Sequence, residues 1–113
     1  MKDSALKATL QAHYLWLCGR GGQQADLAGA DLRGADLQDA DLEKADLAWS
    51  NLKEANLGRA NLKDANLSGA RLDGAYLRGA DLQGANLQGA NLCGVDLSGV
   101  KLEGADLRGT ENL

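Results

Sequence analysis

The sequence contains no phenylalanine, and only two tyrosines, two tryptophans and one histidine stand among its 113 residues. Aromatic side chains dominate the core of many globular domains, so a core of another kind is expected here. No apolar run approaches the roughly 18 residues that a membrane-spanning helix needs. The amino-terminal segment is polar and mixed in charge, unlike a signal peptide. We therefore expect a single cytoplasmic domain without a membrane association.

Basic residues and cysteines are also few. The formal net charge is −4, whereas a protein that binds DNA or RNA directly presents a basic face to the phosphates. We therefore expect no direct nucleic-acid binding. The two cysteines, Cys18 and Cys93, match neither a disulfide framework nor a zinc-binding pattern. Both are expected to be free thiols.

Leucine, in contrast, recurs at a fixed spacing. It stands at position 27 and at every fifth position to 107, which makes 17 consecutive repeats. Two residues before these leucines stands alanine in 14 cases, and one residue before them stands aspartate in eight and asparagine in six. The repeating unit is therefore Ala-(Asp/Asn)-Leu-x-x.

A five-residue period excludes an amphipathic helix, because successive leucines would lie about 140° apart around its axis. In an extended segment, alanine and leucine point to one side and the residue between them points to the other. The next two residues break this alternation, so the chain must bend there. Each repeat therefore predicts a short strand followed by a corner.

The second corner residue is glycine in 11 of the 17 repeats. Glycine at the third position of a turn indicates a type II turn, because that position takes positive φ. Six middle repeats have another residue there, and we expect a different turn type in them: Asp39, Lys44, Trp49, Glu54, Arg59 and Asp64. If four equal bends close one coil, residues 20 apart stack at about 4.8 Å. Five of the seven such pairs in which both residues are charged have opposite charges.

The array from Ala25 to Gly109 resembles the pentapeptide-repeat family. This resemblance implies an all-β solenoid: a right-handed quadrilateral parallel β-helix with four repeats per coil. In this fold, a leucine stands at the centre of each side, and its side chain points into the interior of the coil. We expect about four coils over residues 25–109, preceded by an N-terminal capping helix and lead-in over residues 1–24. Residues 110–113 form a C-terminal tail in this division.

Both ends of a solenoid expose core and unpaired backbone unless they are capped. Residues 3–18 predict a helix, with Asp3 or Ser4 as its N-cap and Gly19 as its stop. We expect it to cover the first coil with one side, formed by Leu6, Leu10, Tyr14 and Leu17.

No second helix follows the last repeat in this sequence. The family resemblance implies tail-to-tail dimers. We therefore expect a homodimer through residues 92–113, with Leu102, Leu107 and Leu113 as candidate contacts.

Trp49 is the first candidate for a binding residue. It replaces a corner glycine, and the residues stacked on it, 20 positions either way, are Gly29 and Gly69. An exposed tryptophan flanked by charges is typical of a binding hot spot, so we name five candidate interaction residues: Trp49, Lys44, Glu54, Arg59 and Tyr76. The alternative is an indole that lies flat on its own coil and has no partner.

No catalytic, metal or cofactor site is predicted. His13, the only histidine, is interpreted as a packed or solvent-facing residue of the capping helix. Five aspartates ring the first coil: Asp26, Asp31, Asp36, Asp41 and Asp46. Calcium prefers such oxygen ligands, but these side chains face successive sides of a square. We expect them to hydrogen-bond nearby backbone instead.

Two functions of different classes remain open. The first is a non-enzymatic protein-interaction or structural module, in which a rigid prism presents flat polar faces to a protein partner of unknown identity. The second is a DNA mimic that binds DNA gyrase or topoisomerase, which resemblance to the fluoroquinolone-resistance branch of the family implies. The four coils would span only about 20 Å, and the acidity gathers at one end, so the mimic is the weaker alternative.

Overall fold

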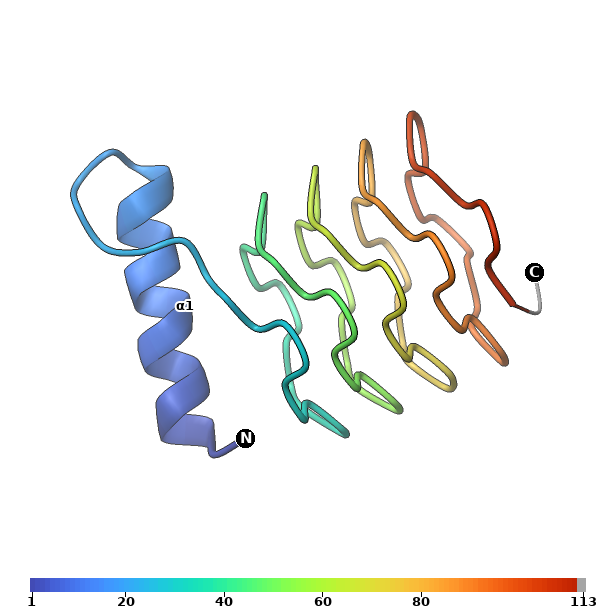
Figure 1. Ribbon diagram of the computed structural model, residues 1–113, viewed down its shortest axis with the longest axis horizontal. Helices are drawn as coiled ribbons and strands as arrows, with labels where there is room; N and C mark the ends of the chain where they lie inside the picture. Colours follow the sequence, from blue (N-terminus) through green and yellow to red (C-terminus); the bar gives the residue numbers. More distant parts are fainter. Residues whose placement is uncertain (112–113) are drawn as a thin grey trace.

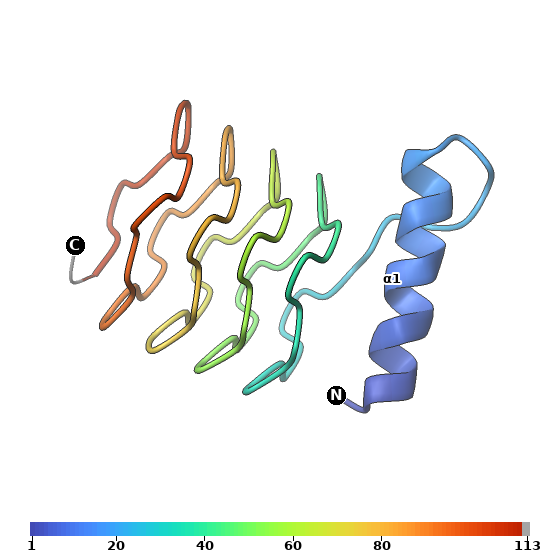
Figure 2. The same ribbon diagram turned by 180° about the vertical axis from the view of Figure 1, so that it is seen from behind.

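The computed structural model describes residues 1–111 and shows one helix lying across the end of a coiled chain (Figure 1). The helix, α1, comprises Asp3–Leu17. The remaining chain is a right-handed quadrilateral β-helix, and the molecule measures 38 × 28 × 21 Å. The last described coil lies at the far end of the solenoid from α1, as the reverse view also shows (Figure 2). In the described residues, no helix is both long and apolar enough to cross a membrane.

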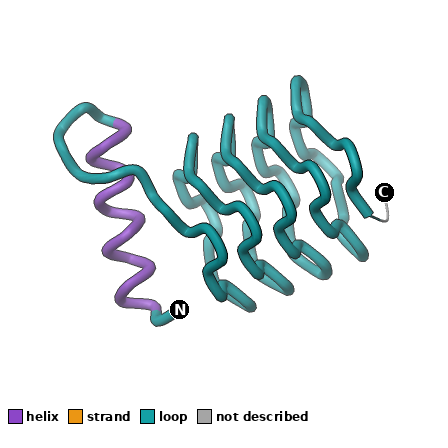
Figure 3. The backbone as a smooth tube through the Cα atoms, in the orientation of Figure 1, coloured by secondary structure: helices purple, strands orange, loops and turns teal. Residues whose placement is uncertain are grey.

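Neighbouring coils are joined by parallel bridges between equivalent positions of successive turns. One such bridge links Asp26 to Asp46, and the next links Asp46 to Asn66. The N–H of Leu27 donates to the carbonyl of Asp46 at 2.7 Å, and the N–H of Asp46 donates to the carbonyl of Ala25 at 3.0 Å. These are isolated bridges rather than the predicted short strands, and no strand is drawn in Figure 3. A turn follows each leucine and limits each bridge to one residue, although neighbouring coils also hydrogen-bond at the turns, where the N–H of Gly29 donates to the carbonyl of Ala48 at 2.8 Å.

The core is a column of leucines flanked by alanines. Every repeat leucine from Leu27 to Leu92 is at most 2% exposed. Alanines of the central coils, such as Ala60 and Ala70, are fully buried beside them. Burying one leucine contributes about 1.5–3 kcal/mol, so the repeated aliphatic column takes the place of an aromatic core.

All corners use one turn. The N–H of Ala30 donates to the carbonyl of Leu27 at 3.1 Å across Gly29, whose φ is 68°. The different turn predicted at the six corners without glycine is wrong, because their φ values of 55–63° are also positive. At Trp49, for example, the N–H of Ser50 donates to the carbonyl of Leu47 at 3.1 Å. The stacked coils impose one backbone path, so residue preference does not change the turn.

The lid helix confirms the predicted cap over the first coil and corrects two details. Its N-cap is Lys2, in an extended conformation and without a side-chain hydrogen bond, so the expected cap at Asp3 or Ser4 is wrong. Gly19, at φ 70°, follows the helix end as predicted. Leu6 and His13 are buried against the coil, whereas Tyr14 is 52% exposed and does not belong to the inner side.

The last described coil is less well covered. Leu97, Leu102 and Leu107 are only partly buried. A bridge from Asn91 reaches Glu111, so the coil register continues to the last described residue. Leu113, the third candidate dimer contact, lies outside the described residues. The homodimer through residues 92–113 stays a prediction.

Candidate interaction surface

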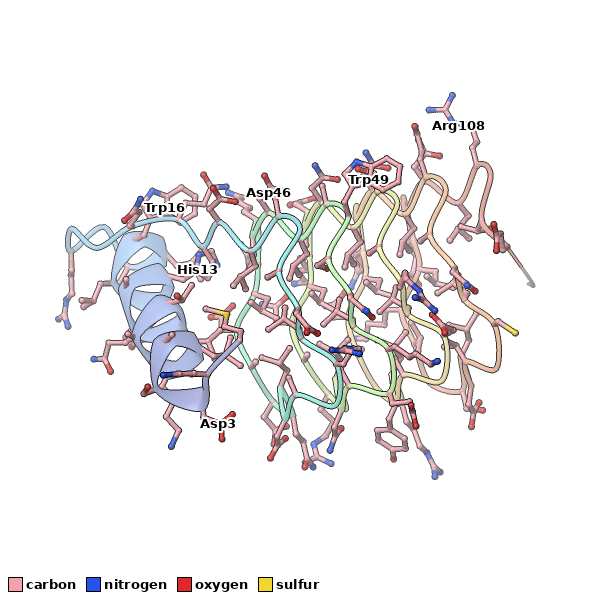
Figure 4. The ribbon with its side chains drawn as sticks, turned by 60° about the horizontal axis from the view of Figure 1, so that its bottom comes forward. Asp3, His13, Trp16, Asp46, Trp49 and Arg108 are labelled. Carbon is pink, nitrogen blue, oxygen red and sulfur yellow. The ribbon has the colours of Figure 1, made fainter. Side chains whose placement is uncertain are left out.

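Trp49 is the most exposed large apolar side chain among the described residues, at 74%. Its backbone has φ 60°, a left-handed conformation that is rare for a bulky residue. The indole lies over the next corner of the same column: a Cβ atom at Gly69 would come within 2.6 Å of its Cδ2 atom. Figure 4 shows Trp49 projecting from the outside of the prism. The indole therefore packs on the Gly69 corner, which has no side chain.

The charged candidates do not surround Trp49. Lys44, Trp49, Glu54 and Arg59 form four successive corners, which are the four corners of one quadrilateral coil. Lys44 and Glu54 are therefore each one side away from Trp49, and Arg59 is at the opposite corner. The register instead places small uncharged residues beside the indole: Ala28, Gly29, Ala48, Ser68 and Gly69. We call these five residues together with Trp49 the Trp49 corner.

Arg59 and Tyr76 do come together, on another part of the prism. The guanidinium of Arg59 donates to both carboxylate oxygens of Asp39, at 2.8 and 3.0 Å. These hydrogen bonds lower the pKa of Asp39 and raise the pKa of Arg59, which the nearby Tyr76 raises further. The bridges place Tyr76 between Asn56 and Asp96, as predicted. Trp49 and the pair of Arg59 and Tyr76 therefore lie on two separate surfaces, and Lys44 and Glu54 occupy the two corners between them.

Gly58 is a residue of the second surface that the sequence analysis missed. A Cβ atom at this position would lie 2.9 Å from Cε1 of Tyr76, so the missing side chain makes room for the phenol ring. A signal was present in the sequence. Gly58 is the only glycine directly after a repeat leucine, and Tyr76 is the only aromatic residue directly before one.

The aspartates of the first coil confirm their predicted role. Each accepts a hydrogen bond from the backbone N–H two residues later, as Asp26 does from Ala28 at 3.2 Å. Arg33 also binds Asp31 through its side chain, and this hydrogen bond is the main reason that the pKa of Asp31 falls to about 2. Within residues 1–111, no group of three His, Cys, Asp or Glu side chains is placed to hold a metal ion.

The stacked charges form fewer ion pairs than their spacing indicates. Of the five oppositely charged stacked pairs, Asp39 with Arg59 makes a salt bridge in the described structure. Lys63 lies 3.7 Å from Asp81 on the following coil rather than pairing with Glu43. Pairs along one coil, such as Arg33 with Asp31 at 2.9 Å, are about as close as the stacked pair at 2.8 Å. Charged side chains therefore pair with neighbours in the same coil as well as with residues of the stacked coils.

Comparison with known proteins places this geometry in a family. A family model described as pentapeptide repeats matches eight copies, over residues 23–47, 40–79 and 75–110. The pentapeptide repeat protein Rfr23 from the cyanobacterium Cyanothece 51142 is 46% identical, with a TM-score of 0.77. That match covers 79% of this chain and 60% of Rfr23, so the chain spans less than two thirds of its relative's length. No curated protein matches the chain.

Two further solved structures are similar over about three quarters of this chain. A pentapeptide repeat protein from the thylakoid lumen of Arabidopsis thaliana is 36% identical, with a TM-score of 0.50, and the match covers 75% of this chain and 63% of that one. QnrB1, a plasmid-mediated fluoroquinolone resistance protein, is 23% identical, with a TM-score of 0.47, over 76% and 59% of the two chains. The latter similarity is too low to carry a functional argument. From the repeat match over residues 23–110 and the similarity to Rfr23, this chain belongs to the pentapeptide-repeat family.

Proposed function

We propose that this protein is a non-catalytic binding module that holds a protein partner at the Trp49 corner. The observation that carries the proposal is the 74% exposure of an indole whose backbone conformation is strained. A left-handed conformation costs about 1–2 kcal/mol for a residue other than glycine. Five other corner residues carry the same strain, so the exposure of the indole is what singles out Trp49, and glycine at this corner would remove the strain.

The surroundings of the indole favour a binding role. The adjacent small residues leave its outer side open, and its contact with Gly69 fixes its position before any partner arrives. A preorganised aromatic residue loses little conformational freedom on binding, which favours affinity. Tryptophan is also among the residues that most often dominate interface energies. The proposed partner therefore contributes an apolar pocket or flat apolar surface to this corner.

The test compares three proteins in a pull-down from a bacterial lysate: wild type, Trp49→Gly and Tyr76→Asn. Trp49→Gly restores the residue found at the other corners of this column, and Tyr76→Asn removes the exposed aromatic residue of the other surface. A partner that wild type and Tyr76→Asn retain, and Trp49→Gly loses, supports the proposal. Equal capture by Trp49→Gly contradicts it.

A pair of glycine substitutions tests the position of the indole. Gly69→Ala places a methyl group against the Trp49 ring, whereas at Gly89 a Cβ atom would meet only the backbone nitrogen of Gly69, at 4.0 Å. The two glycines have φ values of 66° and 69°, so both variants carry the same backbone strain. We expect Gly69→Ala to weaken partner binding more than Gly89→Ala. Equal affinities, measured by calorimetry, would exclude a role for the indole's placement.

No specific observation favours the alternative of a DNA mimic. Several carboxylates pair locally with arginines, including Asp31, Asp39 and Asp106 with Arg33, Arg59 and Arg108. Such pairs interrupt the rows of negative charge that would imitate phosphates. A gyrase supercoiling assay distinguishes the two functions, because inhibition at micromolar protein that Trp49→Gly retains would support the mimic.

A further inference from the structure

The buried side of α1 meets the first coil through a histidine with two fixed backbone partners. His13 is completely buried, and Figure 4 shows it on the side of α1 that faces the first coil. Its Nδ1 atom accepts a hydrogen bond from the backbone N–H of Ala25 at 2.9 Å, and its Nε2 atom lies 2.8 Å from the carbonyl oxygen of Glu43. An N–H group can only donate and a carbonyl can only accept. The imidazole must therefore be neutral, with its proton on Nε2.

Protonation is incompatible with this arrangement. An imidazolium carries N–H groups at both nitrogens, so Nδ1 can no longer accept from Ala25 and two donors face each other. Ala25 is only 2% exposed, which leaves its N–H no access to water while the lid is closed. Opening the lid hydrates both groups. The protonated state of His13 therefore favours an open lid.

The charged groups near this contact come from both sides. On the first coil, Asp26, Asp41 and Glu43 attract an imidazolium and Lys44 repels it. On α1, the neighbouring Cys18 side chain raises the pKa of Tyr14, and Trp16 stacks on the imidazole at 5.6 Å between ring centroids. The carboxylate of Glu43 accepts from Asn61, toward the second coil. In the described residues, both bonds of His13 go to backbone and none goes to a carboxylate.

Few other polar contacts join the lid to the solenoid. The amide of Gln24 donates to the carbonyl of Lys44 at 2.6 Å, and the terminal ammonium of Met1 donates to the carbonyl of Asp31 at 2.7 Å. Leu6 supplies the buried apolar contact of the helix. Beneath α1 lies the end of the leucine column, formed by Leu27, Leu32, Leu37 and Leu42, each at most 2% exposed.

We infer that His13 is a pH-sensitive latch, which holds α1 closed while neutral and releases it when protonated, exposing the apolar end of the first coil. The direction of the pH dependence of lid closure follows from proton linkage. In the closed lid the Ala25 N–H already occupies Nδ1, which leaves no place for a second proton on the ring, whereas an imidazole in water titrates near pH 6.5. The closed state is therefore fully favoured above that value and loses its advantage as pH falls, by up to about tenfold per pH unit.

Native-state hydrogen exchange tests the latch. The protection factor of the Ala25 amide, corrected for intrinsic exchange, is measured at pH 7.5 and 5.5 against that of Leu62 in the second coil. We expect protection of Ala25 to fall by up to about tenfold in acid, while that of Leu62 is unchanged. His13→Gln is the matched control, because its amide can both donate and accept but does not titrate. Equal protection of Ala25 at both pH values in wild type, or an equal fall in His13→Gln, overturns the inference.

A second measurement does not depend on the variant. The ¹⁵N chemical shifts of the imidazole report its tautomer directly. At pH 7.5 we expect the proton on Nε2. In acid, we expect the imidazolium signal to appear together with the loss of Ala25 protection. An imidazolium that coexists with a fully protected Ala25 amide would show that protonation does not open the lid.

Discussion

The ring of Tyr76 lies where a side chain at Gly58, on the preceding coil, would be, with only 2.9 Å between its Cε1 atom and an ideal Cβ atom at Gly58. Gly58 is not among the residues with positive φ, so its backbone does not require glycine. Glycine is therefore required at position 58 to leave room for the Tyr76 ring. The Tyr76 ring can therefore pack against the backbone at Gly58, on a surface otherwise lined by polar side chains.

A double-mutant cycle measures this relationship. Gly58→Ala should lower the free energy of unfolding by about 1–3 kcal/mol, because the methyl group and the ring compete for one space. In a Tyr76→Asn background the same change should be neutral, or stabilising by about 0.4–1 kcal/mol, because alanine restricts the unfolded chain. Guanidinium titrations of the four proteins give the coupling. Equal effects in both backgrounds would show that ring and glycine are independent.

Ser50 carries an unpaired hydroxyl in the core. It stands where most repeats have alanine, it is fully buried, and its Oγ atom has no hydrogen-bond partner among the described residues. Ser50→Ala removes a buried unsatisfied group, so we expect the free energy of unfolding to rise by about 1–3 kcal/mol. The reverse change at the stacked position, Ala70→Ser, should destabilise the protein. A loss of stability in Ser50→Ala would reveal a partner for the hydroxyl.

The non-glycine corner residues differ in whether a salt bridge offsets their backbone strain. Glu54, at φ 60°, belongs to no salt bridge of the described structure, whereas Arg59, at φ 55°, is paired with Asp39. Glu54→Gly should raise the free energy of unfolding by about 0.5–1 kcal/mol, because relief of left-handed strain exceeds the added freedom of the unfolded chain. Arg59→Gly should gain less, because it also removes the exposed ion pair with Asp39. Denaturant midpoints of both variants are compared with wild type; a larger gain for Arg59→Gly would contradict the prediction.

The leucine period predicted a repeated extended segment and corner, because 17 repeats impose the same requirement on the chain, whereas the right-handed quadrilateral form was implied by the family resemblance. The turn at non-glycine corners was not predictable from residue preference, since the stacked coils dictate φ at Lys44 or Trp49 as firmly as at Gly69. The conformational preference of a single residue is overridden where the neighbouring coils already fix the path of the backbone.

The candidate site was predicted in part. Exposure of Trp49 followed from its glycine neighbours, but its charged sequence neighbours diverge, because adjacent repeats face different sides of the coil. His13 could not be recognised as the contact between lid and coil. Its partners are the backbone atoms of Ala25 and Glu43, and backbone atoms leave no signal in the residue pattern.

Acid should weaken the first coil through Asp31. Hydrogen bonds from the side chain and then the backbone of Arg33 lower the pKa of this carboxyl from 3.8 to about 2. A folded-state pKa below the unfolded value means that the ionised carboxylate stabilises the fold above about pH 4, and that this contribution is lost as pH falls toward 2. Arg33→Ala should therefore raise the pKa of Asp31 toward 3.8, as measured by NMR titration of the carboxyl carbon.

Asp106 provides the control for this prediction, because its pKa is lowered mainly by a hydrogen bond from Arg108, at the other end of the solenoid. Arg33→Ala should leave the titration of Asp106 unchanged, and Arg108→Ala should raise the pKa of Asp106 without affecting Asp31. Such independence is expected of exposed pairs more than a Debye length apart, about 8 Å at physiological salt. If the pKa of Asp31 stayed near 2 in Arg33→Ala, backbone hydrogen bonding alone would hold the carboxylate ionised. Arg33 would then contribute nothing to keeping the Asp31 carboxylate ionised in acid.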